Sequence, residues 1–207
     1  MLQQYIMVAA SILPVSFYKG QLYFLFGKEN QMEDSAKGFS DFGGGVEKGE
    51  SILETAYREG SEELCGFLGD AASIRNLIEK NGGYLKHSHN DYNIHIFPMK
   101  YDENLPIYYT NNHHFVWNRI NKKILNDSKI FEKQEIRWFS LPELVSKRNE
   151  FREFYREIVD TIKARIPEIR RFITRKLIGT NKKHFNKYAN RNKTRRMGIF
   201  GLPVKGG

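Results

Sequence analysis

Residues 43–64 read GGGVEKGESILETAYREGSEEL, and this stretch decides how the rest of the chain is interpreted. Three glycines and a polar turn precede a segment, Ser51 to Leu64, in which apolar side chains recur with the period of an α-helix. On that helix Glu59, Glu62 and Glu63 share one face, because they stand at positions i, i+3 and i+4. The stretch therefore predicts a glycine loop followed by a helix that carries three clustered carboxylates.

The chemistry of this cluster points to a divalent metal ion. Carboxylates within one helical turn repel one another, and a bound cation removes that repulsion. Oxygen ligands without His or Cys favour Mg²⁺ or Mn²⁺, and glycines let the backbone approach a metal or a phosphate closely. A metal beside such a loop can polarise a phosphoryl oxygen and activate water. The alternative is a solvated acidic face, as on many helices; the complete spacing described next favours the metal site.

The spacing Gly44-x₅-Glu50-x₇-Arg58-Glu59-x₂-Glu62-Glu63 resembles the signature of the Nudix hydrolases. Before the motif, two apolar runs at 5–15 and 21–26, separated by Tyr18-Lys19-Gly20, predict a β-hairpin. This hairpin and the segment WFSLPEL at 138–144 are also similar to that family. The resemblance implies an α/β fold, namely an α/β/α sandwich with a mixed sheet. It further implies metal-dependent hydrolysis of a nucleoside diphosphate linked to some other group.

Carried over position by position, the resemblance assigns a role to each motif residue. Glu59, Glu62, Glu63 and the backbone carbonyl of Gly44 are the expected metal ligands, while Gly43, Glu50 and Arg58 are expected to hold the loop against the helix. Either Glu59 or Glu63 is the expected base. A further catalytic acid is expected before Trp138, where the spacing favours Glu132 over Glu135.

The chain departs from the family pattern at two places near the end of the motif. Gly60 follows Arg-Glu where the family has an apolar residue, at a cost of about 1 kcal/mol in helix propensity relative to Ala. Cys65 stands where the family has glycine, so we expect the helix to end one residue later, with Gly66 as its left-handed cap. No activating partner for Cys65 is evident, which favours a packed thiol over a nucleophile.

Patterning along the rest of the chain predicts three regions. Residues 1–147 are predicted to form the hydrolase domain, 148–178 an appended helix, and 179–207 a basic, flexible tail. Within the domain the predicted elements are strands at 5–15, 21–26, 84–86, 92–99 and 135–139, a loop at 27–40, and helices at 51–64, 70–80 and 112–125. A long helix is predicted over 151–178, with a bend at Pro167.

Charge is distributed unevenly over the 207 residues. Of 33 Lys and Arg and 24 Asp and Glu, residues 163–207 hold 14 basic and one acidic, so this segment carries +13 and the remainder −4. Such asymmetry favours a polyanionic partner, and RNA is the predicted one. The candidate RNA-binding residues are Arg170, Arg171, Arg175, Lys176, Lys182, Lys183, Arg195 and Arg196. Tyr108 and Trp117 are candidates for base stacking; ordinary core and surface aromatics are the alternative.

Composition excludes several classes of protein. A single Cys rules out a disulfide scaffold and a Cys₄ zinc site, and the spacing of the six His does not indicate metal ligands. No apolar run approaches the roughly 20 residues that cross a bilayer, and the N-terminus does not read as a signal peptide. We therefore expect a cytoplasmic protein without a membrane partner, although the basic tail is also compatible with nuclear targeting.

Three functions follow from these observations. The first is removal of the 5′ cap or 5′ phosphates of RNA, with the basic segment holding the RNA. The second is hydrolysis of a small diphosphate, such as a nucleotide sugar, a dinucleoside polyphosphate or a diphosphoinositol phosphate. The third is a non-catalytic RNA-binding protein, against which the intact Glu59, Glu62 and Glu63 argue.

Overall fold

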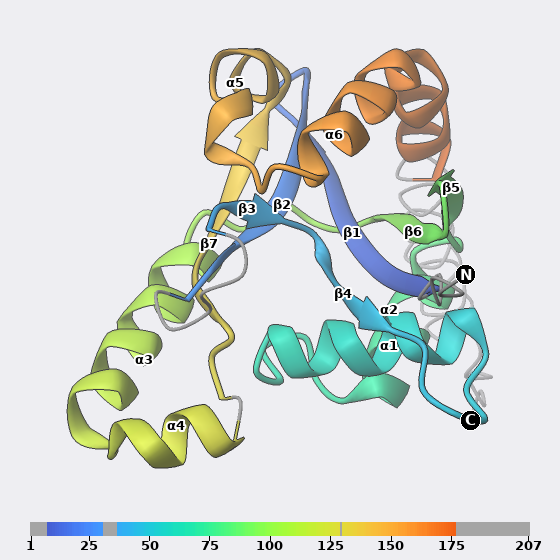
Figure 1. Ribbon diagram of the computed structural model, residues 1–207. Coiled ribbons are helices and arrows are strands. Elements are labelled where there is room, and N and C mark those ends of the chain that lie inside the picture. The colour runs from blue at the N-terminus through green and yellow to red at the C-terminus, as the bar shows by residue number, and fades with distance from the viewer. Residues whose placement is uncertain (1–7, 31–36, 129, 177–207) are drawn as a thin grey trace, which may run out of the picture.

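The computed structural model describes residues 8–30, 37–128 and 130–176, which form a mixed β-sheet with helices on both faces (Figure 1). The strands are β1 (Ala9–Tyr18), β2 (Gln21–Glu29), β3 (Phe39–Ser40), β4 (Phe42–Gly45), β5 (Leu85–His89), β6 (Tyr92–Pro98) and β7 (Lys133–Ser140). The helices are α1 (Ile52–Glu63), α2 (Ala71–Lys80), α3 (Leu105–Arg119), α4 (Lys122–Ser128), α5 (Leu141–Ser146) and α6 (Tyr155–Ala164), and a further helix covers residues 166–176. A short 3₁₀ turn, Arg148–Glu150, follows α5.

The central strand β1 pairs with three others. It runs parallel to β6 along one edge, and antiparallel to β2 and β4 along the other. The predicted hairpin is confirmed: Lys19 and Gly20 both have positive φ, which the tight turn between two twisted strands requires. Because β2 pairs only with the last residues of β1 and β4 only with the first, the two strands diverge from this edge. Figure 1 shows β2 and β4 leading away from β1 in different directions.

The two faces of the sheet carry different helices. One core, which includes Ile12, Ala56 and Tyr109, lies between the sheet and α1, α2 and α3. The other, which includes Phe26, lies between the sheet and α5, α6 and helix 166–176. The sheet is thus a middle layer between two helical layers (Figure 1). This confirms the α/β/α sandwich.

The predicted long C-terminal helix is two helices. α6 ends at Ala164, residue 165 forms a turn, and Pro167 stands in the first turn of helix 166–176, where a missing N–H costs no hydrogen bond. Ile158, Ile162, Ile169 and Ile173 are buried in the same core as the sheet strands. The predicted boundary between the hydrolase domain and the appended helix, at residue 148, stays a prediction. Residues from both sides of this boundary pack into one hydrophobic core.

Two other segments differ from their predictions. The stretch predicted as a loop contains the end of β2 and all of β3, while residues 31–36 lie outside the described part. The helix predicted at 112–125 starts seven residues earlier, with Pro106 in its first turn, and Ile120 interrupts it in an extended conformation. None of the helices in the described part of the chain combines the length and apolar character needed to cross a bilayer.

Candidate active site

Helix α1 begins where the sequence predicted, because Ser51 and Glu54 form a capping box at its N-terminus. Ser51 is the N-cap: its hydroxyl accepts the Glu54 N–H at 3.3 Å, and its own N–H donates to the Glu54 carboxylate at 2.8 Å. Further along, a Cβ on Gly60 would lie 2.3 Å from Cδ1 of Ile12. Gly60 therefore lets α1 pack directly on β1, a role that helix propensity alone did not reveal.

The end of α1 differs from the prediction by one residue. Cys65 already occupies the left-handed position after the C-cap, with φ of 49°, and the predicted Gly66 follows it with φ of 71°. The Cys65 N–H donates to the Glu62 carbonyl and the Gly66 N–H donates to the Ser61 carbonyl, both at 2.9 Å, which is the Schellman pattern. The Sγ accepts the Phe131 N–H at 3.3 Å, and burial raises the pKa of the thiol. Cys65 is thus a packed side chain of the site's wall.

Arg58 ties the glycine strand to the carboxylates of α1. Its guanidinium holds Glu50 with two bonds, of 2.7 and 3.0 Å, and donates to the Gly45 carbonyl at 3.2 Å. It also donates to Glu59 at 2.9 Å and to Glu62 at 3.0 Å. The bonds from Arg58 lower the pKa of Glu50 to about 2. One cation thus neutralises part of the acidic cluster and joins the loop to the helix.

Glu63 lies deeper than the other two carboxylates of the motif, and both its oxygens are engaged. Oε2 accepts the Gly43 N–H at 2.7 Å, and Oε1 lies 3.0 Å from Nζ of Lys133. Burial raises the pKa of Glu63, and the attraction of Lys133 opposes that rise. Lys133 also contacts Glu29, whose carboxylate accepts a bond from Arg152 at 2.6 Å.

Sequence reasoning missed Glu29, Lys133 and Arg152. A lysine that opens a strand gives no local sign that it will be buried, since Lys is almost never buried unless it is paired. Its partner Glu29 stands 104 positions earlier in the chain. Only the pairing of β2 with β7 brings the two together.

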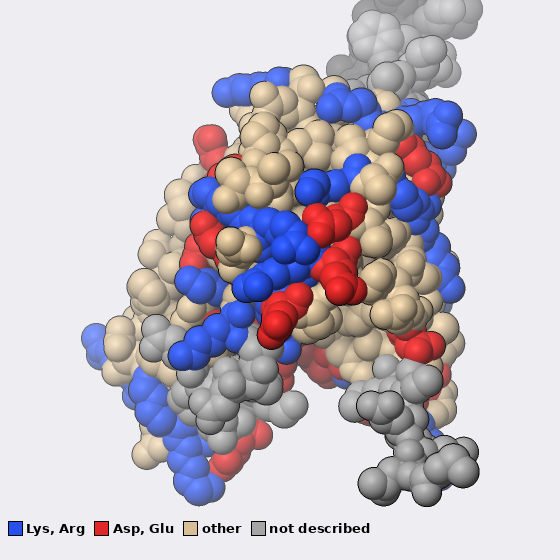
Figure 2. Space-filling view, turned by 45° about the horizontal axis from the view of Figure 1, so that its top comes forward, with Lys and Arg blue, Asp and Glu red and all other residues tan. Residues whose placement is uncertain are grey.

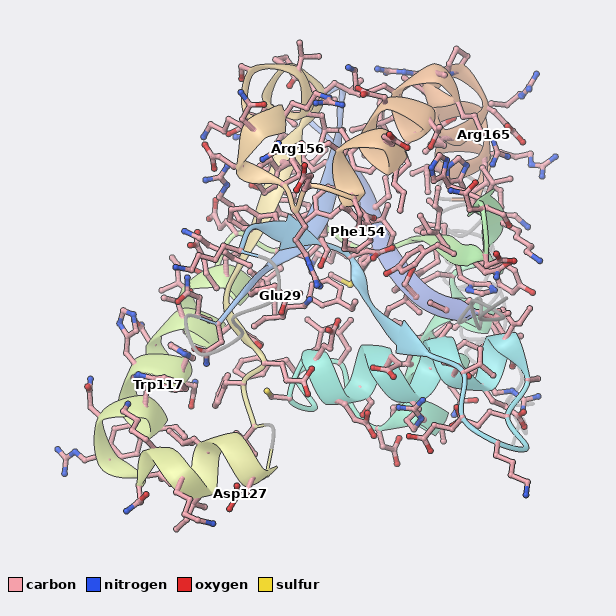
Figure 3. All side chains as sticks on the ribbon, viewed as in Figure 1. Glu29, Trp117, Asp127, Phe154, Arg156 and Arg165 are labelled. Carbon is pink, nitrogen blue, oxygen red and sulfur yellow. The ribbon has the colours of Figure 1, made fainter. Side chains whose placement is uncertain are left out.

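The carboxylates line a cleft of about 1120 Å³. The walls are the glycines of β4, the carboxylates of α1, the residues 130–132 before β7, and Asn112 and Val116 of α3. Glu132 lines this cleft whereas Glu135 does not. Glu29, which also lines it, lies near the centre of the molecule, between the sheet and α1 (Figure 3).

The residues predicted to stack on a base lie outside the cleft lining. Trp117 stacks on His113 with ring centroids 5.2 Å apart, and Nζ of Lys122 lies 3.9 Å from its ring centroid. In Figure 3 Trp117 projects from α3, well away from Glu29. Tyr108 is 58% exposed on the same helix. Neither residue is part of the cleft wall.

The basic residues of the C-terminal segment fall into two groups. Arg170, Arg171, Arg175 and Lys176 lie on helix 166–176, on the opposite face of the sheet from α1, whereas Lys182, Lys183, Arg195 and Arg196 lie outside the described residues. Figure 2, turned toward the α5–α6 side, shows basic and acidic side chains mixed at the centre of this face and basic ones along its edge. The described basic helix and the cleft are therefore separated by the sheet.

The donors of the cleft suit a hard divalent cation. They are all oxygens, and burial raises the pKa of Glu59, with Glu62 and Glu132 adding to the rise. A Cβ on Gly44 would lie 2.5 Å from Oε1 of Glu59, so only glycine brings the loop backbone this close to the carboxylate. Within the described residues no three acidic, His or Cys side chains yet converge on one point, because these carboxylates turn to Arg58 and Lys133. The donor set fits Mg²⁺ or Mn²⁺, provided that Glu59 and Glu62 turn from Arg58 toward the ion.

Comparison with known proteins gives one extensive match. The model of the NUDIX domain matches residues 7–162. No curated protein sequence matches the chain.

Among solved structures, a C. elegans Ap4A hydrolase in a binary complex is 12% identical, with a TM-score of 0.46, over 79% of this chain and 99% of that chain. A mutT/nudix family protein from Listeria innocua is 13% identical, with a TM-score of 0.42, over 79% and 95%. The NUDIX domain of Shewanella oneidensis NrtR, complexed with ADP ribose, is 10% identical, with a TM-score of 0.33, over 68% and 76%.

Proposed function

Since this chain belongs to the Nudix hydrolase family and is a hydrolase of pyrophosphate bonds, we propose that it cleaves the 5′ cap or 5′ phosphates of RNA. The observation that carries the chemistry is the placement of Glu59, Glu62, Glu63 and Glu132 around one cleft of about 1120 Å³. The observation that favours RNA is the +13 charge of residues 163–207, since a small nucleotide has too few phosphates to need it.

Our proposal gives Glu59 the role of base. Both oxygens of Glu63 are occupied, by Gly43 and Lys133. The carboxylate of Glu59, which also lines the cleft, is bonded through Oε1 alone, to Arg58, within the described part of the chain. The raised pKa of Glu59 also brings its carboxylate nearer to the pKa that suits a base at neutral pH. Glu59 would take the proton from the attacking water at a carboxylate oxygen.

The remaining acids would hold the cation. Glu62, Glu63 and Glu132, together with the backbone carbonyl of Gly44, are the proposed ligands of Mg²⁺ or Mn²⁺. When bound, such an ion stabilises the charge on phosphoryl oxygens and makes water a better nucleophile. Arg58 would hold the loop and helix in place through Glu50 and the Gly45 carbonyl.

A second candidate substrate is a small diphosphate compound, such as a dinucleoside polyphosphate or a nucleotide sugar. The position of helix 166–176 favours it: the described basic residues lie across the sheet from the cleft, so a short substrate would not reach them. RNA bound at the cleft would have to pass the sheet edge to contact that helix. The two candidates therefore predict different effects of removing the basic residues.

The decisive experiment is hydrolysis of cap-labelled RNA with Mg²⁺ or Mn²⁺, beside a panel of free dinucleotides, nucleotide sugars and diphosphoinositol phosphates. RNA cleavage should release the capped nucleoside diphosphate. Replacing Arg170, Arg171 and Arg175 with Ala, or deleting residues 180–207, should weaken RNA cleavage, most strongly at low salt, and spare small substrates. Equal losses on both substrate classes would refute the RNA proposal and leave a small diphosphate as the substrate.

Glu59→Gln should abolish turnover of every substrate in the same assay. Glu153→Gln, an exposed position of the loop before α6, is the matched control and should leave turnover unchanged. Full activity of the Glu59 variant would remove the proposed base.

A further inference from the structure

A buried network of charges lies behind the carboxylate wall. The ammonium of Lys133 is fully buried and has three oxygen partners: Glu29, Oε1 of Glu63 at 3.0 Å, and Oγ of Ser40 at 3.0 Å. A lysine ammonium has three N–H donors. All three are therefore satisfied by the protein itself, and two of the acceptors are carboxylates.

The fold is shaped around this side chain. Lys133 opens β7 opposite Glu29, next to an irregularity in the pairing with β2. A Cβ on Gly27 would lie 2.8 Å from Cγ of Lys133, so β2 leaves room for the aliphatic stem where the lysine crosses it. The single proton of the Tyr109 hydroxyl is shared between the carbonyl oxygens of Lys133, at 3.0 Å, and Glu63, at 2.9 Å. Both ends of the Lys133–Glu63 pair are thus held in place.

The geometry points to Lys133 as a built-in cation that takes the place of one divalent metal ion in the cleft. This inference rests on the proposed function, because it assumes that the carboxylates of α1 hold metal. Two buried carboxylates that face one point, Glu29 and Glu63, are arranged as ligands of a cation, and Nζ of Lys133 occupies that point. Divalent ions would then bind only on the outer side of Glu63, toward the other proposed ligands, Glu62 and Glu132.

Removal of the ammonium should open a new metal position. In Lys133→Met the side chain keeps much of its length and loses its charge, so no cation lies between Glu29 and Glu63, and Glu29 keeps only Arg152 on its other side. Breaking a buried ion pair by removing one partner is strongly destabilising, and an ion that replaces the partner should restore stability. The variant should therefore bind one more Mn²⁺ per chain than the wild type.

The experiment is a titration with Mn²⁺, in which electron paramagnetic resonance counts the free ion, and a thermal unfolding curve with and without MnCl₂. We expect the gain in Tm with Mn²⁺ to be larger in Lys133→Met than in the wild type by about 5 °C or more. Lys133→Arg keeps a cation, and Glu29→Gln/Lys133→Met removes one charge of each sign; both should bind the wild-type number of ions. Equal numbers in the wild type and Lys133→Met would overturn the inference.

Refolding tests the inference even if Lys133→Met is unstable, and the number of ions bound by the wild type separates the inference from the proposed function. If Lys133→Met folds only when refolded with Mn²⁺, and not with an equal ionic strength of NaCl, the inference is supported. If it fails to fold with Mn²⁺ while Glu29→Gln/Lys133→Met folds, the inference is wrong, because no ion replaces the ammonium. A wild-type protein that binds no Mn²⁺ would refute the proposed function as well, whereas binding that is equal in wild type and variant refutes only the role of Lys133.

Discussion

Replacing Gly60 with Ala tests how α1 is held on the sheet. In an isolated helix this change would be stabilising by about 1 kcal/mol, because Ala has the higher helix propensity. In the folded protein the new Cβ would lie 2.3 Å from Cδ1 and 2.7 Å from Cγ1 of Ile12. The two effects have opposite signs, and their sizes decide the outcome.

The packing effect should prevail. Ile12 is fully buried in the core under α1, so its side chain cannot move into solvent, and two of its atoms would have to shift. Overpacking of a core typically costs about 1–3 kcal/mol. After the gain of about 1 kcal/mol in helix propensity, we expect Gly60→Ala to lower the free energy of unfolding by up to about 2 kcal/mol, with about 1 kcal/mol as the central value.

Urea unfolding, with the slope m checked for constancy, measures this loss. Ile12→Val removes Cδ1 and alone should cost about 1 kcal/mol. In that background Gly60→Ala should cost less than in the wild type, with a coupling of about 1 kcal/mol between the two changes. Asn76→Ala, at an exposed position of α2, is the control for helix propensity and should be neutral or slightly stabilising. Gly60→Ala as stable as the wild type, or strictly additive changes, would refute the packing argument.

Two other changes probe the site and the α3–α4 layer. Glu50→Gln should free Arg58 to pair more strongly with Glu59 and Glu62, so the metal concentration for half-maximal turnover should rise about tenfold; an unchanged metal requirement would contradict this. His113 is buried with both ring nitrogens unpaired among the described residues, and burial, helped by His114 and Lys122, lowers its pKa to about 4. The folded protein disfavours the charged form of His113. The contribution of neutral His113 to the free energy of unfolding should therefore be fully present above pH 6.5 and be lost as the pH falls toward 4. Between pH 7 and 5 the free energy of unfolding of His113→Phe should fall by roughly 2 kcal/mol less than that of the wild type. Equal falls in the two proteins would contradict this.

Local sequence signals were sufficient to predict the carboxylate wall of the cleft. The start of α1 follows from Ser51 and Glu54, which cap the helix through bonds three residues apart, and its extent follows from an apolar stripe to within one residue. The positions of Glu59, Glu62 and Glu63 on one face follow from the helical period. All of these relations lie within one stretch of 22 residues, 43–64.

Two features of the structure, the start of α3 and the conformation of Cys65, were not predictable from local sequence patterns. The start of α3 was missed because its buried residues, Leu105, Tyr109 and His113, form a narrow stripe whose members are not uniformly apolar. Cys65 takes a left-handed conformation that sequence preferences assign to glycine. Its Sγ accepts a backbone N–H from Phe131, 66 positions away, which no local pattern could show.

The cleft carries more acidic than basic side chains, so its charge opposes the binding of a phosphate-rich substrate. Six acids line the cleft, Glu29, Glu47, Glu59, Glu62, Glu63 and Glu132, against the two arginines Arg58 and Arg152. Both arginines are already bonded to carboxylates. A substrate rich in phosphates would therefore be repelled unless a divalent ion reduced the negative charge. Because the +13 of residues 163–207 is the largest positive charge in the chain, we expect substrate affinity to depend on it most at low salt, where screening is weakest.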